Sequence, residues 1–434
     1  MAATEPLVRR RLTRRRLRTS PAPPSRFGLL RRAADYRRLF VATLASGAGT
    51  YLAAVALTVD VFDRTGSGTW VSALLIAEFL PAILIGLLLG PLVDRWSRRR
   101  LLIASDLVRL AVFCILPFAG SAAAVVALAF VAGVATGFFR PAVYAGMPNL
   151  VDDDDLPTAN ALLQAVDNVA WMIGPVVGGL LLTVHGPDLA YWLNAVSFLV
   201  SALLLVRIPA RRLQAGQIES RGHWQDLGDG FRLVRRSRAL VTVLVVWNIV
   251  LFGSAAVNVA EVVLAKVSLD AGDVGFGLLV GASGLGLTLG SLAAGPILDR
   301  LSVRQTYSGL IAVMALGFGI AAVAPNLAVA VAGVVLGTFG NGAAVVCNAL
   351  FVQRGAPDEL RGRAFTVIMS SNYVVLGLGM AVAGPLVDEF GARWLWGGAS
   401  VGFLLASLTA VVLARGFDRS VAPAELEGAV PSRV

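Results

Sequence analysis

The sequence predicts an all-α membrane protein with 12 transmembrane helices in two pseudo-symmetric six-helix bundles. Composition is the first observation, since 57% of the 434 residues are hydrophobic and only 15% are charged, against about 25% charged in soluble proteins. Apolar segments of the length that crosses a bilayer are the second. The third is a charged decapeptide that occurs twice, in equivalent places of two halves. Together these features indicate a duplicated helical bundle in lipid.

Each predicted span is an apolar segment of about 20 residues or more. The links between several neighbours are only a few residues long, so those neighbours must be antiparallel. The spans are 38–62, 68–93, 99–119, 122–147, 158–183, 188–208, 239–265, 274–298, 304–324, 326–351, 362–387 and 393–415.

The repeated decapeptide begins at Gly90 in the first half and at Gly295 in the second. The first copy reads Gly-Pro-Leu-Val-Asp94-Arg95-Trp-Ser, and the second reads Gly-Pro-Ile-Leu-Asp299-Arg300-Leu-Ser, 205 residues later. Two copies at equivalent positions between apolar spans indicate an internal duplication.

Basic residues are distributed unequally between the two sides of the predicted membrane. The chain holds 37 basic and 27 acidic residues, a net charge of +10. With the N-terminus inside, the inner segments hold 32 of the basic residues and the outer loops hold three, Arg64, Lys266 and Arg393. This asymmetry places both termini in the cytoplasm. High Ala, Gly and Arg content with one lysine is typical of a bacterial protein, so we expect the plasma membrane. Twelve of the basic residues lie before Phe40, and most of the others lie in the segments between spans, so their placement argues against a nucleic-acid partner.

A polar stretch divides the spans into six and six. Trp224, Leu227 and Phe231 in this stretch could lie on one face of a short amphipathic helix. The predicted parts are a disordered basic cytoplasmic tail 1–36, an N-terminal bundle 37–208, a cytoplasmic linker 209–237, a C-terminal bundle 238–416 and a cytoplasmic tail 417–434.

The chain resembles transporters of the major facilitator superfamily, in which a G-x-x-x-D-R-x-x-R-R-like pattern follows the second and eighth spans. Within it, the chain is similar to the drug:proton antiporter branch that contains the enterobactin exporter, macrolide efflux proteins and actinobacterial multidrug efflux proteins. The stretches that carry this narrower match are 65–67, 139–160, 224–240 and 357–363. The resemblance covers residues 37 to about 416. It implies a proton-coupled secondary transporter that exports small amphipathic or hydrophobic molecules by alternating access.

The decapeptides are predicted to form a cytoplasmic latch. Asp94 can accept backbone N–H groups at the N-terminus of another helix. The resemblance implies that this helix is the eleventh span, and that the contact holds the cytoplasmic side shut. Alternatively, the charges only satisfy the positive-inside rule. The latch candidates are Gly90, Asp94, Arg95, Arg98, Asp106, Arg109, Asp299, Arg300, Arg361 and Arg363.

Four carboxylates are candidates for proton coupling, because an ionisable group inside a span costs about 2.5–3.5 kcal/mol and needs a reason. Glu78 is the deepest, and a carboxyl at this depth suits a proton carrier. Alternatively, it is a protonated group hydrogen-bonded within the bundle. Asp60 and Glu261 lie near outer ends of spans, where water or a loop partner is within reach. Asp167 is the fourth.

The cavity candidates are polar or aromatic residues inside spans. Arg140 could hold Asp167 or an anionic substrate, or extend to the cytoplasmic interface. The R-x-x-x-G-x-G-like pattern that many drug:proton antiporters carry in this span is missing. The amides could instead join helices, and the aromatic rings could face lipid or the core. The candidates are Arg140, Asn168, Trp171, Trp247, Asn248, Asn341 and Asn372.

The sequence indicates no enzyme, cofactor or metal site. The stretch 284–290 imitates a dinucleotide-binding loop, but it lies within an apolar span, so it predicts helix packing. His185 and His223 are too far apart to indicate a metal site. We expect a monomer whose partners are a small-molecule substrate, protons and the bilayer. Alternatives are a siderophore exporter or lysophospholipid transporter of the same fold, or a transport-inactive sensor or scaffold.

Overall fold

The computed structural model describes residues 26–88, 96–214, 231–357 and 360–414, and its regular secondary structure in these ranges is helical. Ten helices of the described part are long and apolar enough to cross a membrane. Helix α7 is counted once among these ten, although it contains two predicted spans. Helix α3 is not among them, because only a shorter apolar segment of it, Gly68–Ala82, was counted. The long helices are α2 (Ala34–Thr65), α3 (Gly68–Leu88), α5 (Arg98–Ile115), α6 (Ala122–Gly146), α7 (Leu156–Val206), α10 (Arg238–Val263), α11 (Gly272–Leu298), α12 (Val303–Ala322), α13 (Leu327–Gly355), α14 (Arg361–Phe390) and α15 (Ala392–Leu413).

Helix α7 reverses direction at Gly186. This residue has φ 64° and ψ −167°, a conformation that glycine adopts without steric cost, and Pro187 follows. Both ends of α7 lie beside the start of α2: Tyr36 donates to the Ala159 carbonyl at 2.8 Å, and Arg38 donates to the carbonyl of Arg207, just after α7, at 3.1 Å. The two parts of α7 are therefore antiparallel, in the places where the sequence predicts spans 158–183 and 188–208.

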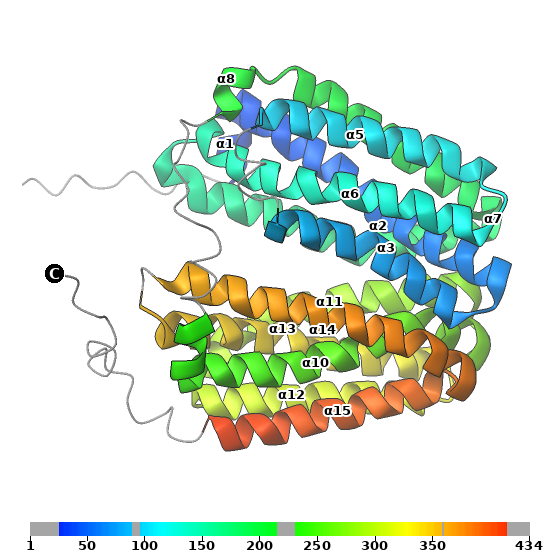
Figure 1. Ribbon diagram of the computed structural model, residues 1–434, viewed down its shortest axis with the longest axis vertical. Coiled ribbons are helices and arrows are strands. Elements are labelled where there is room, and N and C mark those ends of the chain that lie inside the picture. The colour runs from blue at the N-terminus through cyan, green and yellow to red at the C-terminus, as the bar shows by residue number, and fades with distance from the viewer. Residues whose placement is uncertain (1–25, 89–95, 215–230, 358–359, 415–434) are drawn as a thin grey trace, which may run out of the picture.

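The helices form two groups that lie side by side (Figure 1). The first group contains α2 to α7, with α3 against α6 and α2 against α7. The second contains α10 to α15, in which α13 packs on α11 and α12, and α10 packs on α14 and α15. Contacts between the groups are made chiefly by α7 with α11 and by α3 with α14.

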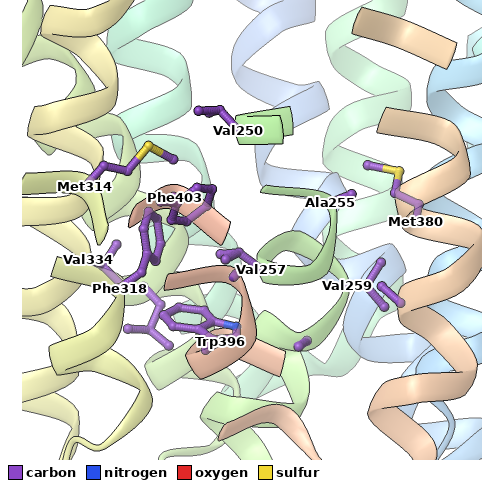
Figure 2. Packing of buried hydrophobic residues seen from close by; sticks show 14 of the residues in the cluster. Val250, Ala255, Val257, Val259, Met314, Phe318, Val334, Met380, Trp396 and Phe403 are labelled. Atoms are coloured by element: carbon purple, nitrogen blue, oxygen red, sulfur yellow. The ribbon is translucent and has the colours of Figure 1, made fainter. Parts of the chain in front are cut away.

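Aromatic rings fill the core of the second group. Phe318 of α12 contacts Trp396 and Phe403 of α15, with ring centroids 5.5 and 5.4 Å apart (Figure 2). Gly253 of α10 faces Phe403, and a Cβ there would lie 2.7 Å from the ring. Trp247 of α10 is also buried in this core.

Small residues let helices approach closely, as is common in membrane bundles. A Cβ on Gly286 of α11 would collide with the backbone of α13 at Val335 and Phe339. The stretch that imitates a dinucleotide-binding loop is therefore a helix-packing surface, as predicted.

The beginning of the linker is held against the first group. Helix α8 (Ala210–Leu213) buries Leu213, and the Leu213 carbonyl accepts hydrogen bonds from Arg98 and Asn149. The predicted amphipathic helix falls mostly outside the described residues, which omit Trp224 and Leu227. Phe231, the remaining member of its predicted apolar face, is exposed.

Candidate functional site

A cavity of about 80 Å³ opens inside the first group, among α2, α5, α6 and α7. Polar and charged side chains form much of its wall, although the helices that supply them are mostly apolar. The lining residues are Thr43, Ser46, Gly47, Thr50, Tyr51, Arg109, Thr136, Phe139, Arg140, Val143, Tyr144, Leu163 and Asp167.

Two of the predicted residues meet at this cavity. Arg140 of α6 donates from Nη2 to Oδ2 of Asp167 on α7 at 3.0 Å. The Arg140 side chain is 56% exposed and that of Asp167 is 17% exposed, so the cation is accessible from the cavity and the carboxylate is mostly enclosed. Pairing with Asp167 is one of the three roles for Arg140 that the sequence analysis leaves open.

Helix α2 supplies a polar face that we did not single out from the sequence. Thr43, Ser46 or Gly47, and Thr50 recur every three to four residues, which places them on one side of the helix. The hydroxyls of Thr43 and Thr50 donate to the carbonyls four residues earlier, which satisfies them in an apolar surrounding. Tyr51 and Tyr144 were also missed. The periodicity of small polar residues in the first span was the available signal.

Asp106 and Arg109 form a buried pair on α5. Asp106 accepts from Arg109 Nη2 at 2.6 Å and from the Ser201 hydroxyl at 2.6 Å, and its side chain is fully buried. The Arg109 guanidinium lies 4.2 Å from the ring centre of Phe139 and 4.4 Å from that of Phe198. The pair therefore joins α5, α6 and α7 within the first group. Its assignment to the cytoplasmic latch stays a prediction.

The carboxylate of Asp60 is engaged within the first group. It accepts from Arg64 Nε at 2.6 Å and from the Tyr191 hydroxyl at 2.9 Å, and Arg64 also donates to the Ala119 carbonyl. Asp60 thus has the loop-side partner expected at the end of a span, and this geometry favours a structural ion pair over a proton carrier.

Glu78 and Glu261 lie apart from the cavity. Glu78 is half-buried on α3 with no side-chain hydrogen bond recorded to the described residues. Glu261 is 7% exposed on α10, and its Oε1 has no hydrogen-bond partner in the described part of the chain. Both stay candidates for proton coupling.

The remaining cavity candidates are divided between the core and half-buried positions. Trp247 is buried in the core of the second group, which is the alternative that the sequence analysis leaves open for it. Asn248 donates to the Ser371 hydroxyl at 2.8 Å, between α10 and α14. Asn372 is buried, and neither amide atom has a partner among the described residues. Asn168, Trp171 and Asn341 are half-buried, and Asn168 accepts from Gln164.

Gly90, Asp94 and Arg95 lie outside the described residues, so the centre of the predicted cytoplasmic latch keeps its status as a prediction. Arg98 donates to the carbonyls of Ala145 and Leu213, which ties the start of α5 to α6 and α8. Asp299 and Arg300 are exposed at the end of α11, with no side-chain hydrogen bond recorded to residues that the structure covers. In the first turn of α14, Arg361 donates to the Gln353 carbonyl, and Arg363 lies beside it.

The two groups are joined at one end of the molecule. We call it the distal end, carrying residues 63–69, 266–273 and 388. The opposite, proximal end carries α8 and the starts of α2 and α14. Asp388 of α14 accepts hydrogen bonds at the start of α3, and Lys266 contacts Asp63 at 2.5 Å and Asp273 at 2.7 Å. A Cβ on Gly277 of α11 would lie 2.5 Å from the Pro175 carbonyl oxygen of α7.

Residues 25–422 match the family described as transmembrane secretion effector, which belongs to the major facilitator superfamily. The chain is a member of this family. It is thus a multi-pass membrane transporter and not an enzyme.

The transporter's curated relatives include efflux pumps. It is 28% identical to the multidrug efflux pump Tap of Mycolicibacterium fortuitum, over 87% of this chain and 95% of the relative. It is 23% identical to macrolide efflux protein A of Streptococcus pyogenes, over 78% of this chain and 86% of the relative.

Solved structures share the transporter's fold. The nucleoside transporter NupG matches with a TM-score of 0.73 at 14% identity, over 88% of this chain and 99% of that one. A bacterial homologue of ferroportin, solved in an inward-facing state, matches with a TM-score of 0.71 at 15% identity, over 88% and 99% of the two chains.

Proposed function

We propose that the protein is a proton-coupled secondary transporter that exports small amphipathic or hydrophobic molecules from the cytoplasm by alternating access. The relatives named as multidrug and macrolide efflux pumps support the substrate class. The direction of transport rests on the same likeness.

In this proposal the chain has twelve spans, divided into an N-terminal bundle 37–208 and a C-terminal bundle 238–416 joined by the linker 209–237. The reversal of α7 and the two helix groups in Figure 1 support the division. The distribution of basic residues supports a plasma-membrane orientation with both termini, and so the proximal end, in the cytoplasm. One chain supplies every wall of the cavity, which supports a monomer.

The Arg140–Asp167 pair at the cavity is the observation that carries the proposal. An ionised Asp167 accepts from Arg140, whereas a protonated one has no charge to hold the guanidinium. Arg140 is then free to rearrange against the cavity wall. If a proton binds Asp167 and a substrate binds beside Arg140, each binding event changes the affinity for the other. Antiport requires such competition between proton and substrate.

Contacts at the distal end suit the cytoplasm-facing half of a transport cycle. The distal end is closed, and the cavity lies nearer the proximal end. In this arrangement substrate would enter the cavity from the cytoplasm, and the distal contacts would block access from outside the cell. Sites between helix bundles near the midplane, reached alternately from the two sides, are typical of secondary transporters.

The test is uptake by everted membrane vesicles energised with an acid interior, across a panel of antibiotics, dyes, siderophores and lysophospholipids. We expect gradient-dependent uptake of antibiotics or dyes. Asp167→Asn should abolish this dependence while substrate exchange without a gradient continues. The matched control is Asp154→Asn, which removes an exposed charge before α7.

Glu78→Gln is measured beside them, because Glu78 is the competing proton carrier. Uptake that survives collapse of the gradient would exclude proton coupling. Full coupling in Asp167→Asn together with its loss in Glu78→Gln would move the coupling site to α3. Uptake confined to siderophores or lysophospholipids would replace the proposed substrate class.

A further inference from the structure

The pentapeptide that opens the repeated decapeptide occurs a third time, at the distal end of α14. Residues 384–388 read Gly-Pro-Leu-Val-Asp, identical to residues 90–94. This copy does not follow from the duplication of the halves, because the position 205 residues before Asp388 is Thr183. Its geometry is fully described, unlike that of residues 90–94.

The third copy closes onto the start of α3. A Cβ on Gly384 would lie 2.8 Å from the Thr69 Cα, so glycine permits the two helices to touch. One turn later Asp388 accepts four hydrogen bonds: from Ser67 Oγ at 2.8 Å, Gly68 N at 2.5 Å, Thr69 N at 3.1 Å and Thr69 Oγ1 at 2.7 Å.

Helix α3 lacks a capping carboxylate of its own, since its first turn contains no acidic residue. The first N–H groups of a helix have no partner within the helix and carry partial positive charge. Asp388 supplies the missing acceptor from the other helix group. The Ser72 hydroxyl donates to the Met380 carbonyl one turn further in, so the same two helices are joined again.

The copy at 295–299, at the proximal end, lacks these contacts in the part of the chain that the structure describes. A Cβ on Gly295 would meet nothing within 4 Å, and Asp299 is exposed with no hydrogen bond recorded for its side chain in the described ranges. Within the described residues, one pentapeptide therefore contacts the other helix group at the distal end, whereas the copy at the opposite end makes no such contact.

We propose that residues 384–388 form a distal latch, in which Asp388 caps α3 and holds the transporter closed on that side. The latch must release whenever the distal end opens. Asp388 is a positioning residue, because it acts through the start of α3 and does not line the cavity. The inference rests on the proposed alternating access, but its test measures conformation without transport.

The test places spin labels in lipid nanodiscs at two exposed distal positions, Gly120 and Val323, and at two exposed proximal positions, Arg211 and Leu301. Cys114 and Cys347 are first replaced by serine and alanine. Removing a helix-capping carboxylate changes an equilibrium about fivefold. Asp388→Ala should therefore raise the population with a long distal distance at least about fivefold, and it should shorten the proximal distance.

The matched control is Glu389→Gln, which removes a neighbouring exposed charge for which no hydrogen bond to described residues is recorded. It should leave both distance distributions as in the parent. Asp388→Asn keeps the side-chain shape and one acceptor, so it should give an intermediate shift, and it carries the test if the alanine variant does not fold.

Unchanged distances at both ends in the Asp388 variants, or an equal shift in Glu389→Gln, would overturn the distal latch. Proton coupling in Asp167→Asn tests the proposed function alone: loss of coupling supports it, and full coupling counts against Asp167 as the coupling site. Neither result changes the prediction for Asp388. A distal shift in Asp388→Ala would hold even if transport were found to be independent of protons.

Discussion

Carboxylates inside the spans differ in what surrounds them, and this decides which of them can take part in transport. Asp167 faces the cavity through a single ion pair with Arg140, whereas Asp60 is enclosed by Arg64 and Tyr191. A group that must gain and lose a proton needs access to water in at least one state. Asp167 meets this condition in the described structure more directly than Asp60 does.

Asp60→Asn is therefore expected to retain proton-coupled uptake while lowering stability. It removes the ion pair with Arg64 and leaves the Tyr191 hydroxyl a neutral acceptor, which should reduce the free energy of unfolding by about 2 kcal/mol. Thermal melting of the purified protein and vesicle uptake measure the two effects separately. Loss of coupling without loss of stability would return Asp60 to the list of proton carriers.

Arg109→Ala should destabilise the transporter more strongly. It leaves the fully buried Asp106 with Ser201 as its remaining recorded partner, and an uncompensated buried charge costs about 3–5 kcal/mol. A large fall in melting temperature is expected, whereas Arg100→Ala, at an exposed position on the same helix, should have a small effect. Equal melting temperatures for the two variants would mean that the pair adds little to the fold.

Residue identities alone predicted the charged contacts better than the apolar ones. The pairing of Arg140 with Asp167 could be proposed because few partners exist for a charge in a span. Trp247 was assigned to the cavity and lies in the core. Core, lipid and an apolar cavity select the same side chains, so hydropathy cannot tell which way an aromatic ring in a membrane helix points.

Among the helices, those between the two groups are shaped for close approach. Gly179 of α7 and Gly277 of α11 lie against each other's backbones, and a Cβ on Gly179 would lie 2.7 Å from the Asp273 carbonyl oxygen. Such packing closes the distal end between α7 and α11, on the other side of the interface from α3 and α14.

Gly277→Leu should force α7 and α11 apart, because the obstructing atoms belong to the backbone and cannot rotate away. We expect export to fall at least about tenfold with protein levels unchanged, a loss that corresponds to about 1.4 kcal/mol. Gly397→Leu is the control, since a Cβ at this α15 position meets nothing within 4 Å. Normal export by Gly277→Leu would show that this contact is not needed for closure.

The turn within α7 depends on a glycine in a left-handed conformation. Gly186→Ala should lower the free energy of unfolding by about 1 kcal/mol, because φ 64° is unfavourable for a residue with a Cβ. Gly309→Ala is the contrasting change, because this α12 glycine has an ordinary helical conformation and open space around it. Thermal melting should show destabilisation in the first variant and a neutral or stabilising effect in the second.

The positions of most of the described helices were predictable, because length and hydropathy are local properties of the chain. The joining of α3 to α14 was not, since it depends on which helix ends meet in space. Only the two copies related by the duplication were interpreted as parts of a latch. Its third copy at 384–388 was available as a signal, but only the fold brings Asp388 to the start of α3.

At the scale of the whole molecule, the two helix groups meet at the distal end and the cavity lies toward the proximal end. Small groups make the distal contacts: the carboxylates of Asp388 and Asp63, one lysine and a few glycines. Contacts of this size can be exchanged for similar ones at the other end at little net cost in free energy, which a two-state transporter requires. The predicted cytoplasmic latch at Asp94 would be the exchanged contact, with Asp94 supplying the acid and α14 the helix start.

Reciprocal movement of the two ends is the central claim, and the most direct test is to follow both label pairs in the parent protein while pH and an exported drug are varied. We expect the distance between the labels at Gly120 and Val323 to lengthen whenever the distance between those at Arg211 and Leu301 shortens. Two ends that open together, or a pair of distances that responds to neither protons nor drug, would contradict it.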